Sequence, residues 1–222
     1  MNLLAEIAER KVLAIIRADG PERALDCVRT LVGAGITALE VSLTTPGALE
    51  AIARARAQCP PSVLVGAGTV LTADQAEAAA EARAQFAVTP AITPGARRSV
   101  ALGLPLLCGA LTPTEVLTAL DLGAAAVKIF PAGAHGPHYI RELLAPLPTA
   151  PLVAVGGVDA TSAPRYLAAG ARAVAVGSPL LGSAGRGGAQ AELADRAAAL
   201  LAAVGAAGAV PAGRDARRGP GR

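Results

Sequence analysis

A lysine inside an apolar run is the residue of this sequence best suited to act as a nucleophile. Lys128 interrupts the segment Ala126–Pro131, where we expect it to share one face of a strand with Phe130. The chain uses 18 arginines but only two lysines, and the other one, Lys11, falls at a predicted junction between a helix and a strand. Arginine keeps its proton, whereas a lysine beside apolar side chains can lose it and become a nucleophilic amine. Such an amine suits Schiff-base formation with a ketone.

Two further charged residues fall inside predicted strands, where a buried charge needs a reason. Arg17 ends the first of these strands, and Glu40 shares a face of the second with Ser42 and Thr44. Both, like Lys128, lie toward the carboxyl end of their strand, which is the end at which barrel enzymes build their active sites. A carboxylate across a barrel from the amine suits the proton transfers of Schiff-base chemistry. The alternative interpretation is a buried ion pair without chemistry.

Glycines follow two of the predicted strands in the last third of the chain. Gly156 and Gly157 end one strand, and Gly177 and Ser178 end the next. After the seventh and eighth strands of a barrel, such glycines expose backbone N–H groups that bind phosphate. The alternative is that they only let the chain turn. An earlier glycine run ends in Thr69, whose hydroxyl would face a ligand close to the backbone.

The histidines and cysteines are not predicted to form a site. His135 and His138 are close in sequence, but we identify no third metal ligand beside them, so we expect no metal and place them at the surface or at a helix start. The cysteines Cys27, Cys59 and Cys108 have no CxxC spacing, which indicates free thiols in a reducing compartment.

Short β-branched runs alternate with alanine-rich, amphipathic stretches along most of the chain, which is typical of βα units around a parallel sheet. Eight such units predict an α/β fold, the (β/α)8 TIM barrel, preceded by a short helix around Asn2–Ala8. An open doubly wound sheet is the competing fold, but Arg17–Gly20 follows the first strand where that fold has a glycine-rich phosphate loop. The predicted strands are Val12–Arg17, Ala38–Thr44, Val63–Thr69, Phe86–Pro90, Pro105–Gly109, Ala126–Pro131, Leu152–Gly157 and Ala173–Ser178.

The helices between these strands carry recognisable start and stop residues. Thr72 and Thr112 are candidate N-caps. Gly35, Gly123 and Gly170 are expected to end helices in the left-handed conformation. The predicted helices include Glu22–Val32, Ala48–Gln58, Ala73–Ala84, Thr114–Leu122 and Tyr139–Leu144.

The composition disfavours several classes of function. Hydrophobic residues make up 53% of the 222 residues, but aromatic residues only 2%, too few for a surface that stacks single-stranded nucleic acid. The formal charge of +3 is matched by residues 211–222 alone, so the rest is neutral and has no field that attracts nucleic acid or an acidic membrane. We therefore expect one domain over residues 1–204, and a flexible tail over residues 205–222. No signal peptide or membrane span is predicted, because Glu6 and Arg10 interrupt the first apolar residues, so we expect a cytoplasmic protein.

Taken together, these segments resemble the 2-keto-3-deoxy-6-phosphogluconate (KDPG) aldolase family, which includes the 2-keto-3-deoxy-6-phosphogalactonate (KDPGal) aldolases and enzymes active on 4-hydroxy-2-oxoglutarate (KHG). The resemblance runs in order from about Val12 to Leu181. It implies a class I aldolase of the barrel fold that needs no metal or cofactor and is commonly a homotrimer. The segments that carry it are Leu39–Val41, Gly66–Val70, Val88–Pro90, Lys128–Pro131, Gly156–Val158 and Gly177–Ser178.

The same resemblance implies a role for each candidate residue. Lys128 would form the Schiff base, and Glu40 would be the acid and base. The substrate would be a phosphorylated keto acid that is cleaved to pyruvate and glyceraldehyde 3-phosphate. Its pyruvate half would contact Thr69, Pro90 and Phe130, and its phosphate would contact Gly156, Gly157 and Ser178.

The branch of the family is left open by a few positions. By resemblance, Leu43–Thr45 takes the place of a Leu-Arg-Thr triplet in the phosphogluconate branch, so Thr44 stands where that branch has a cation. Arg17 is then the remaining candidate to bind the substrate carboxylate. Arg17 and Val155 both resemble the galactonate branch. Two other classes of function stay open: a phosphate-binding barrel with isomerase or synthase chemistry that needs no Schiff base, and a non-catalytic barrel that binds an effector.

Overall fold

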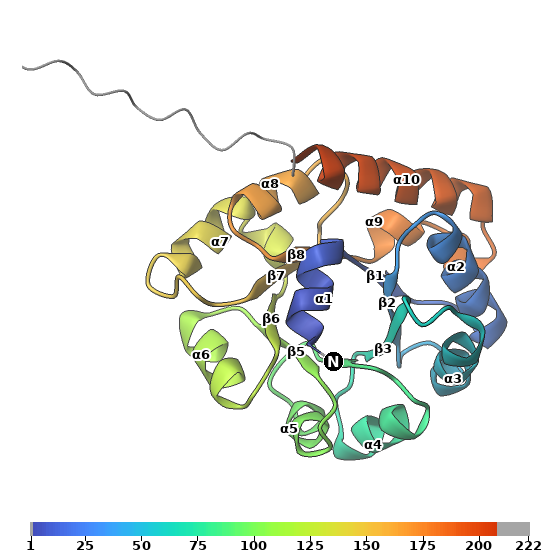
Figure 1. Cartoon of the computed structure of the whole chain (residues 1–222), viewed down its shortest axis with the longest axis horizontal. Coiled ribbons are helices and arrows are strands. Elements are labelled where there is room, and N and C mark those ends of the chain that lie inside the picture. Colours follow the sequence, from blue (N-terminus) through green and yellow to red (C-terminus); the bar gives the residue numbers. More distant parts are fainter. Residues whose placement is uncertain (1, 208–222) are drawn as a thin grey trace, which may run out of the picture.

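The computed structural model describes residues 2–207, which fold around a closed barrel of eight parallel strands paired in chain order, β1 to β8 (Figure 1). The predicted (β/α)8 barrel is therefore confirmed, and the open sheet is excluded because β8 pairs with β1. The strands are β1 Val12–Ile16, β2 Ala38–Ser42, β3 Leu64–Gly68, β4 Ala87–Val88, β5 Leu106–Ala110, β6 Ala126–Ile129, β7 Leu152–Val155 and β8 Ala173–Val176.

Helices form an outer ring around the strands (Figure 1). The Thr72 and Thr112 side chains each accept a hydrogen bond from the third residue of the helix that follows, as predicted. Gly35, Gly123 and Gly170 adopt the positive φ predicted for helix ends. The helices are α1 Leu3–Arg10, α2 Pro21–Gly33, α3 Ala48–Gln58, α4 Ala73–Glu81, α5 Pro94–Ala101, α6 Pro113–Asp121, α7 Pro137–Leu144, α8 Ala163–Ala168, α9 Ser178–Leu181 and α10 Gln190–Ala207, with short 3₁₀ helices η1 Ala132–Ala134 and η2 Ala184–Arg186.

Most strands end earlier than the sequence predicts. β7 ends before Gly156, and β8 before Gly177, because the chain turns there toward the loops. Arg17 and Thr44 likewise lie just beyond β1 and β2. The predicted site residues therefore lie mainly on the loops at the carboxyl ends of the strands, where side chains can reach a ligand.

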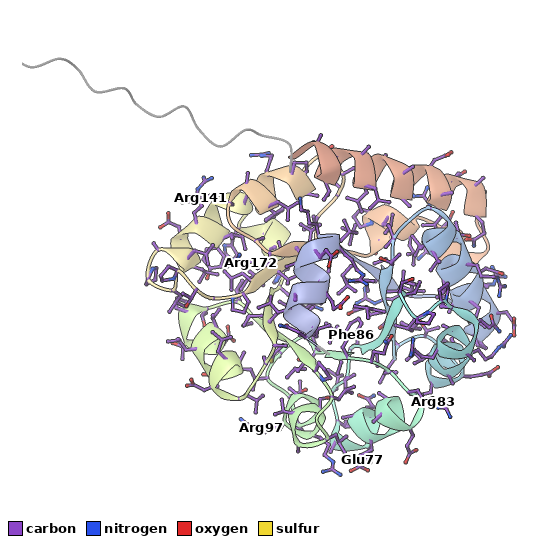
Figure 2. All side chains as sticks on the ribbon, in the orientation of Figure 1. Glu77, Arg83, Phe86, Arg97, Arg141 and Arg172 are labelled. Carbon is purple, nitrogen blue, oxygen red and sulfur yellow. The ribbon has the colours of Figure 1, made fainter. Side chains whose placement is uncertain are left out.

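Two packed layers hold the barrel together. One lies between strands and helices, and the other fills the barrel interior, where residues such as Phe86 and Val153 pack with Leu3 and Ile7 of α1. Figure 1 shows α1 across the opening of the barrel, and Figure 2 shows Phe86 in the middle of the molecule. Burying an aliphatic side chain such as Leu3 or Ile7 stabilises the fold by about 1.5–3 kcal/mol. Because α1 closes this amino-terminal end, ligands must enter from the other end.

The last helix, α10, extends into the segment that the sequence predicted as a tail. Residues 205–207 belong to α10, and the rest of the predicted tail, from residue 208, lies outside the described residues. Within residues 2–207, no helix is both long and apolar enough to cross a membrane.

Candidate active site

Lys128 lies on β6 with its side chain toward the barrel interior, and only 5% of the residue is exposed. Its Nζ lies 4.9 Å from the centre of the Phe130 ring, so the two side chains share one face as predicted. Burial lowers the pKa of the Lys128 amine, and the nearby charge of Arg17 lowers it further, while the Glu40 carboxylate opposes both effects. This environment favours a neutral amine more than water does.

Glu40 lies on β2, faces the same interior and is 1% exposed. Its Oε1 packs against Gly68 of β3, and its Oε2 has no hydrogen-bond partner within residues 2–207. Burial raises the pKa of the Glu40 carboxyl, while the charges of Lys128 and Arg17 lower it. A carboxyl with one unpaired buried oxygen is suited to exchange a proton with a ligand or with a bound water.

A cavity of about 320 Å³ opens beside Lys128. It is lined by eight of the twelve predicted site residues: Arg17, Lys128, Phe130, Val155, Gly156, Gly157, Gly177 and Ser178. The other four, Glu40, Thr44, Thr69 and Pro90, do not line this cavity. The barrel thus brings the amine and the predicted phosphate residues into one space, whereas the residues on β2 and on the loops after β2, β3 and β4 lie outside it.

The glycines after β7 combine a tight turn with close packing. Gly156 has φ 90° and Gly157 has φ 72°, a conformation that side chains rarely adopt. A Cβ on Gly156 would lie 2.9 Å from Cδ2 of Phe130, and the Gly133 backbone N–H donates a 2.8 Å hydrogen bond to the Gly156 carbonyl. The turn therefore explains why glycine is required here, and it also leaves the cavity wall free of side chains for an approaching anion.

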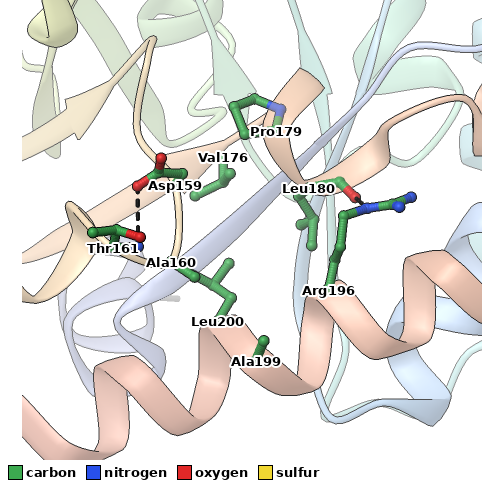
Figure 3. A pocket seen from close by; sticks show the side chains of 9 residues that line it. All are labelled: Asp159, Ala160, Thr161, Val176, Pro179, Leu180, Arg196, Ala199 and Leu200. Atoms are coloured by element: carbon green, nitrogen blue, oxygen red, sulfur yellow. Dashed lines mark hydrogen bonds between the residues drawn. The ribbon is translucent and has the colours of Figure 1, made fainter.

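Ser178 is the first residue of α9, a single helical turn held in place by α10. Nε of Arg196 donates a 2.7 Å hydrogen bond to the Leu180 carbonyl, and Nη2 donates a 2.8 Å hydrogen bond to the Leu181 carbonyl. Figure 3 shows Arg196 of α10 reaching across to the Leu180 carbonyl, with Pro179 above Leu180 in this view. The position of Ser178 at the cavity thus depends on a helix that comes later in the chain.

Ser42 is a polar residue to which the sequence assigned no role. It is fully buried on β2, and its Oγ is hydrogen-bonded to Oγ1 of Thr44 at 2.8 Å and to Oγ1 of Thr69 at 2.9 Å. Thr69 has φ 60°, an uncommon conformation for a threonine, and the Ser42 contact fixes its hydroxyl in that conformation. The signal in the sequence was the alternation that placed Ser42 on the face of Glu40.

Arg17 is exposed and is the first residue after β1. By the alternation of the strand it is on the same face as Leu13 and Ile15, which point into the barrel interior. Its guanidinium forms no salt bridge within residues 2–207. Because β1 pairs with β8, Arg17 lines the cavity together with Ser178 rather than meeting Thr44 there. A cation that is unpaired within the described residues is thus placed beside the predicted phosphate residues.

The histidines and cysteines do not line the cavity of Lys128. His135 precedes α7 and packs on Tyr139, with ring centres 4.8 Å apart. His138 lies on α7, and its Nε2 is 3.5 Å from Oε1 of Glu142. Over residues 2–207 no three side chains of the metal-binding types are grouped together. The three cysteines are free thiols as predicted, and burial raises the pKa of each.

The chain is similar in sequence to aldolases. The model of the family described as KDPG and KHG aldolase matches residues 4–191. Over 171 residues the chain is 39% identical to the 2-dehydro-3-deoxy-6-phosphogalactonate aldolase of Escherichia coli (strain K12), an alignment that covers 76% of this chain and 83% of that protein.

Two solved structures are similar in fold as well. A native KDPGal structure has a TM-score of 0.84 at 36% identity and covers 90% of this chain and 96% of its own. The KDPG aldolase from Legionella pneumophila, with pyruvate captured as a covalent carbinolamine intermediate, has a TM-score of 0.81 at 27% identity and covers 89% of this chain and 97% of its own.

Proposed function

The chain belongs to the KDPG and KHG aldolase family, and from that premise we infer that it is a lyase that works as a class I aldolase. The proposed reaction cleaves a 2-keto-3-deoxy-6-phospho-aldonate, either KDPG or its C4 epimer KDPGal, to pyruvate and glyceraldehyde 3-phosphate. A further candidate substrate is 4-hydroxy-2-oxoglutarate, which would give pyruvate and glyoxylate. All three are 2-keto acids whose ketone an amine can attack.

The observation that carries this proposal is the buried amine of Lys128 on the inner face of β6, with the buried carboxyl of Glu40 on the inner face of β2. A lysine is a nucleophile only when its amine is neutral, and burial lowers the pKa of this one. A carboxyl that is buried without a partner for Oε2 has a proton site available for the reaction. A purely structural ion pair would not require an open cavity beside the amine.

In the proposed mechanism, the Lys128 amine attacks C2 of the substrate and forms a carbinolamine. Glu40, directly or through one water, donates the proton with which the C2 hydroxyl leaves as water, and a protonated imine results. Glu40, now a carboxylate, removes the proton of the C4 hydroxyl. The electrons of the C3–C4 bond then move into the imine, so the aldehyde product leaves and an enamine of pyruvate stays on the lysine. Protonation of C3 and hydrolysis release pyruvate and restore the amine.

The two ends of the substrate have different surroundings in this proposal. The phosphate lies against Gly156, Gly157 and Gly177 and accepts a hydrogen bond from Ser178, with Arg17 in the same cavity supplying charge. This neighbourhood favours a phosphate contact for Arg17 over the carboxylate contact that the sequence suggested.

The carboxylate end is assigned to residues outside the cavity. It faces the hydroxyls of Thr44 and Thr69, which Ser42 orients. Phe130 and Pro90 cover the pyruvate half in the roles that the family resemblance implies.

The alternative without a Schiff base has less support. An isomerase or synthase that uses paired carboxylates or a cysteine needs a second ionisable group near the substrate. No cysteine, aspartate or glutamate lines the cavity of Lys128 within the described part of the chain, and there the one buried carboxyl whose charge acts on the Lys128 amine is that of Glu40. Cys108 is buried in the layer between strands and helices, and its thiol pKa is raised.

The family resemblance also supports proposals about the domain, the assembly and the location of the protein. We propose that the protein is one barrel domain over residues 1–204, that it assembles as a homotrimer, and that it works in the cytoplasm on a small phosphorylated keto acid. No nucleic acid, membrane, metal or organic cofactor is required by the proposed reaction.

The decisive experiment combines trapping with turnover. The full chain is incubated with pyruvate and sodium borohydride, and peptide mass spectrometry should find the reduced pyruvate adduct on Lys128. Release of pyruvate from KDPG, KDPGal and 4-hydroxy-2-oxoglutarate is then followed in an assay coupled to lactate dehydrogenase. Turnover without any adduct would favour the isomerase or synthase class of mechanism, and an absence of both would favour the effector-binding barrel.

A further inference from the structure

The backbone that carries Arg17 is held on one side by a buried threonine. The N–H of Ala18 donates a 3.1 Å hydrogen bond to Oγ1 of Thr45, which lies in the loop after β2 and is 3% exposed. The N–H of Thr45 itself donates to the Ser42 carbonyl at 2.9 Å. The Thr45 hydroxyl therefore ties the end of β1 to the end of β2, in a place from which water is excluded.

On the other side, the same backbone is covered by a glycine of η2. The N–H of Asp19 donates a 3.0 Å hydrogen bond to the Gly185 carbonyl. A Cβ added to Gly185 would lie 2.3 Å from the Arg17 carbonyl oxygen and 3.2 Å from Cα of Ala18. Both are backbone atoms that cannot rotate away, so a side chain at Gly185 must displace one of the two segments.

The segment that contains Gly185 is itself fixed by later and earlier parts of the chain. Nε2 of Gln190 donates to the Ala184 carbonyl at 3.3 Å, and the Thr30 hydroxyl of α2 is hydrogen-bonded to Oε1 of Gln190 at 3.0 Å. Nη2 of Arg196 on α10 donates to the carbonyl of Leu181, the last residue of α9 before this segment. Because these contacts hold η2, we expect a larger residue at Gly185 to displace the backbone of Arg17.

We propose that Thr45 and Gly185 are positioning residues that aim the Arg17 guanidinium into the cavity and at the substrate phosphate, a role that rests on the proposed aldolase function. The side chain of Arg17 is exposed and has no salt-bridge partner among residues 2–207, so the position and direction of its backbone set the region that its charge can reach. Fixing that direction in advance reduces the entropy that is lost when an anion binds.

The test compares two glycine-to-alanine variants of the full chain in the loops around Arg17. Gly185→Ala should raise KM for KDPG and KDPGal about tenfold, the cost of weakening one charge-assisted contact to the substrate, with kcat changed less than twofold. Gly20→Ala is the matched control, because Gly20 lies in the loop that follows Arg17, has φ 177°, and a Cβ there meets nothing within 4 Å. It should leave KM unchanged.

A second pair of variants tests Thr45 and does not depend on added bulk. Thr45→Val keeps the shape but leaves the Ala18 N–H without an acceptor, and should also raise KM for the phosphorylated substrates. Thr45→Ser keeps a hydroxyl and should restore KM to near the wild-type value. Melting temperatures of all variants identify any that fail to fold.

The Arg17→Gln background separates positioning from a general structural effect. In that background Gly185→Ala should not raise KM further, because the guanidinium that it would displace is absent. An equal rise of KM in both backgrounds, or a wild-type KM in both Gly185→Ala and Thr45→Val, would overturn the proposal.

Failure of the aldolase function itself would give a different result, with neither turnover nor a trapped adduct in the wild type. The dissociation constant of inorganic phosphate, measured by calorimetry, then replaces KM in the same comparison. It should rise in Gly185→Ala and not in Gly20→Ala, and equal constants in both would overturn the positioning role.

Discussion

The carboxylate of Glu40 lies directly against the backbone of Gly68 on the neighbouring strand. A Cβ at Gly68 would be 2.6 Å from Oε1 and 2.8 Å from Cδ of Glu40, well inside van der Waals contact. Glu40 and Gly66 are paired in the register of β2 and β3, as are Ser42 and Gly68, so the carboxylate occupies space that Gly68 leaves empty. The carboxyl proposed for proton transfer thus owes its position to the absence of a side chain on another strand.

Gly68→Ala should therefore act on Glu40. The added methyl group must push the carboxylate out of its position, and we expect kcat for aldol cleavage to fall tenfold or more. Overpacking of this kind also costs about 1–3 kcal/mol of stability, which chemical denaturation will measure. Gly33→Ala, whose Cβ would meet nothing within 4 Å, is the control for a glycine-to-alanine change. Unchanged kcat in Gly68→Ala would show that the position of Glu40 does not limit the reaction.

Lys128→Arg should keep the fold and abolish activity. The positive charge near Glu40 is retained, but a guanidinium does not lose its proton and cannot form an imine. We expect a loss of several orders of magnitude in kcat and no adduct with pyruvate and borohydride. Activity within tenfold of the wild type would contradict the Schiff-base assignment.

The pH dependence of trapping should shift in opposite directions when the two neighbours of Lys128 are neutralised. Trapping needs the neutral amine, so its rate rises with pH through the pKa of Lys128, which burial lowers from its ordinary value. Arg17 lowers this pKa, so Arg17→Gln should move the midpoint to higher pH. Glu40 raises it, so Glu40→Gln should move the midpoint to lower pH. Adduct yields measured by mass spectrometry across pH check both signs, and a shift in the same direction would contradict the arrangement.

Ser178→Asp should separate the phosphate end from the reacting end. A carboxylate at the start of α9 would repel the phosphate, so KM for KDPG and KDPGal should rise at least tenfold. Trapping with pyruvate, which has no phosphate, should stay near the wild-type rate. Ser178→Ala, which removes only the hydroxyl, should have a smaller effect on KM. Equal losses in turnover and in trapping would mean that Ser178 maintains the loop rather than binding phosphate.

Val155 should influence which C4 epimer is preferred. It is 1% exposed at the end of β7, faces the interior and lines the cavity of Lys128. A valine cannot hydrogen-bond the C4 hydroxyl, so we expect KDPGal to be used at least as well as KDPG. Val155→Thr should shift the ratio of kcat/KM toward KDPG by about 1 kcal/mol, or five- to tenfold, the value of one hydrogen bond. A hundredfold preference of the wild type for KDPG, or an unmoved ratio in the variant, would exclude Val155 as the selector.

The sequence by itself determined the barrel and the inward direction of its chemical groups. Strand and helix periods differ, so the alternation of β-branched runs with amphipathic stretches was enough to predict eight βα units. The two-residue period of a strand likewise placed Lys128 and Glu40 on the faces that the structure turns to the interior. The type of each element and the face of each side chain depend on neighbouring residues in the chain. They can therefore be predicted without knowing which strands pair.

The tertiary structure alone decided which residues lie together in one cavity. Closure of the barrel pairs β1 with β8, and this long-range contact places Arg17 beside Ser178, although 160 residues separate them in the chain. Ser42 gained its contact with Thr69 from the pairing of β2 with β3, and Gly185 gained its contact with Arg17 from the course of the chain after α9. Side-chain alternation fixes the face on which a residue lies, but the register between distant segments and the course of the loops depend on packing of the whole chain.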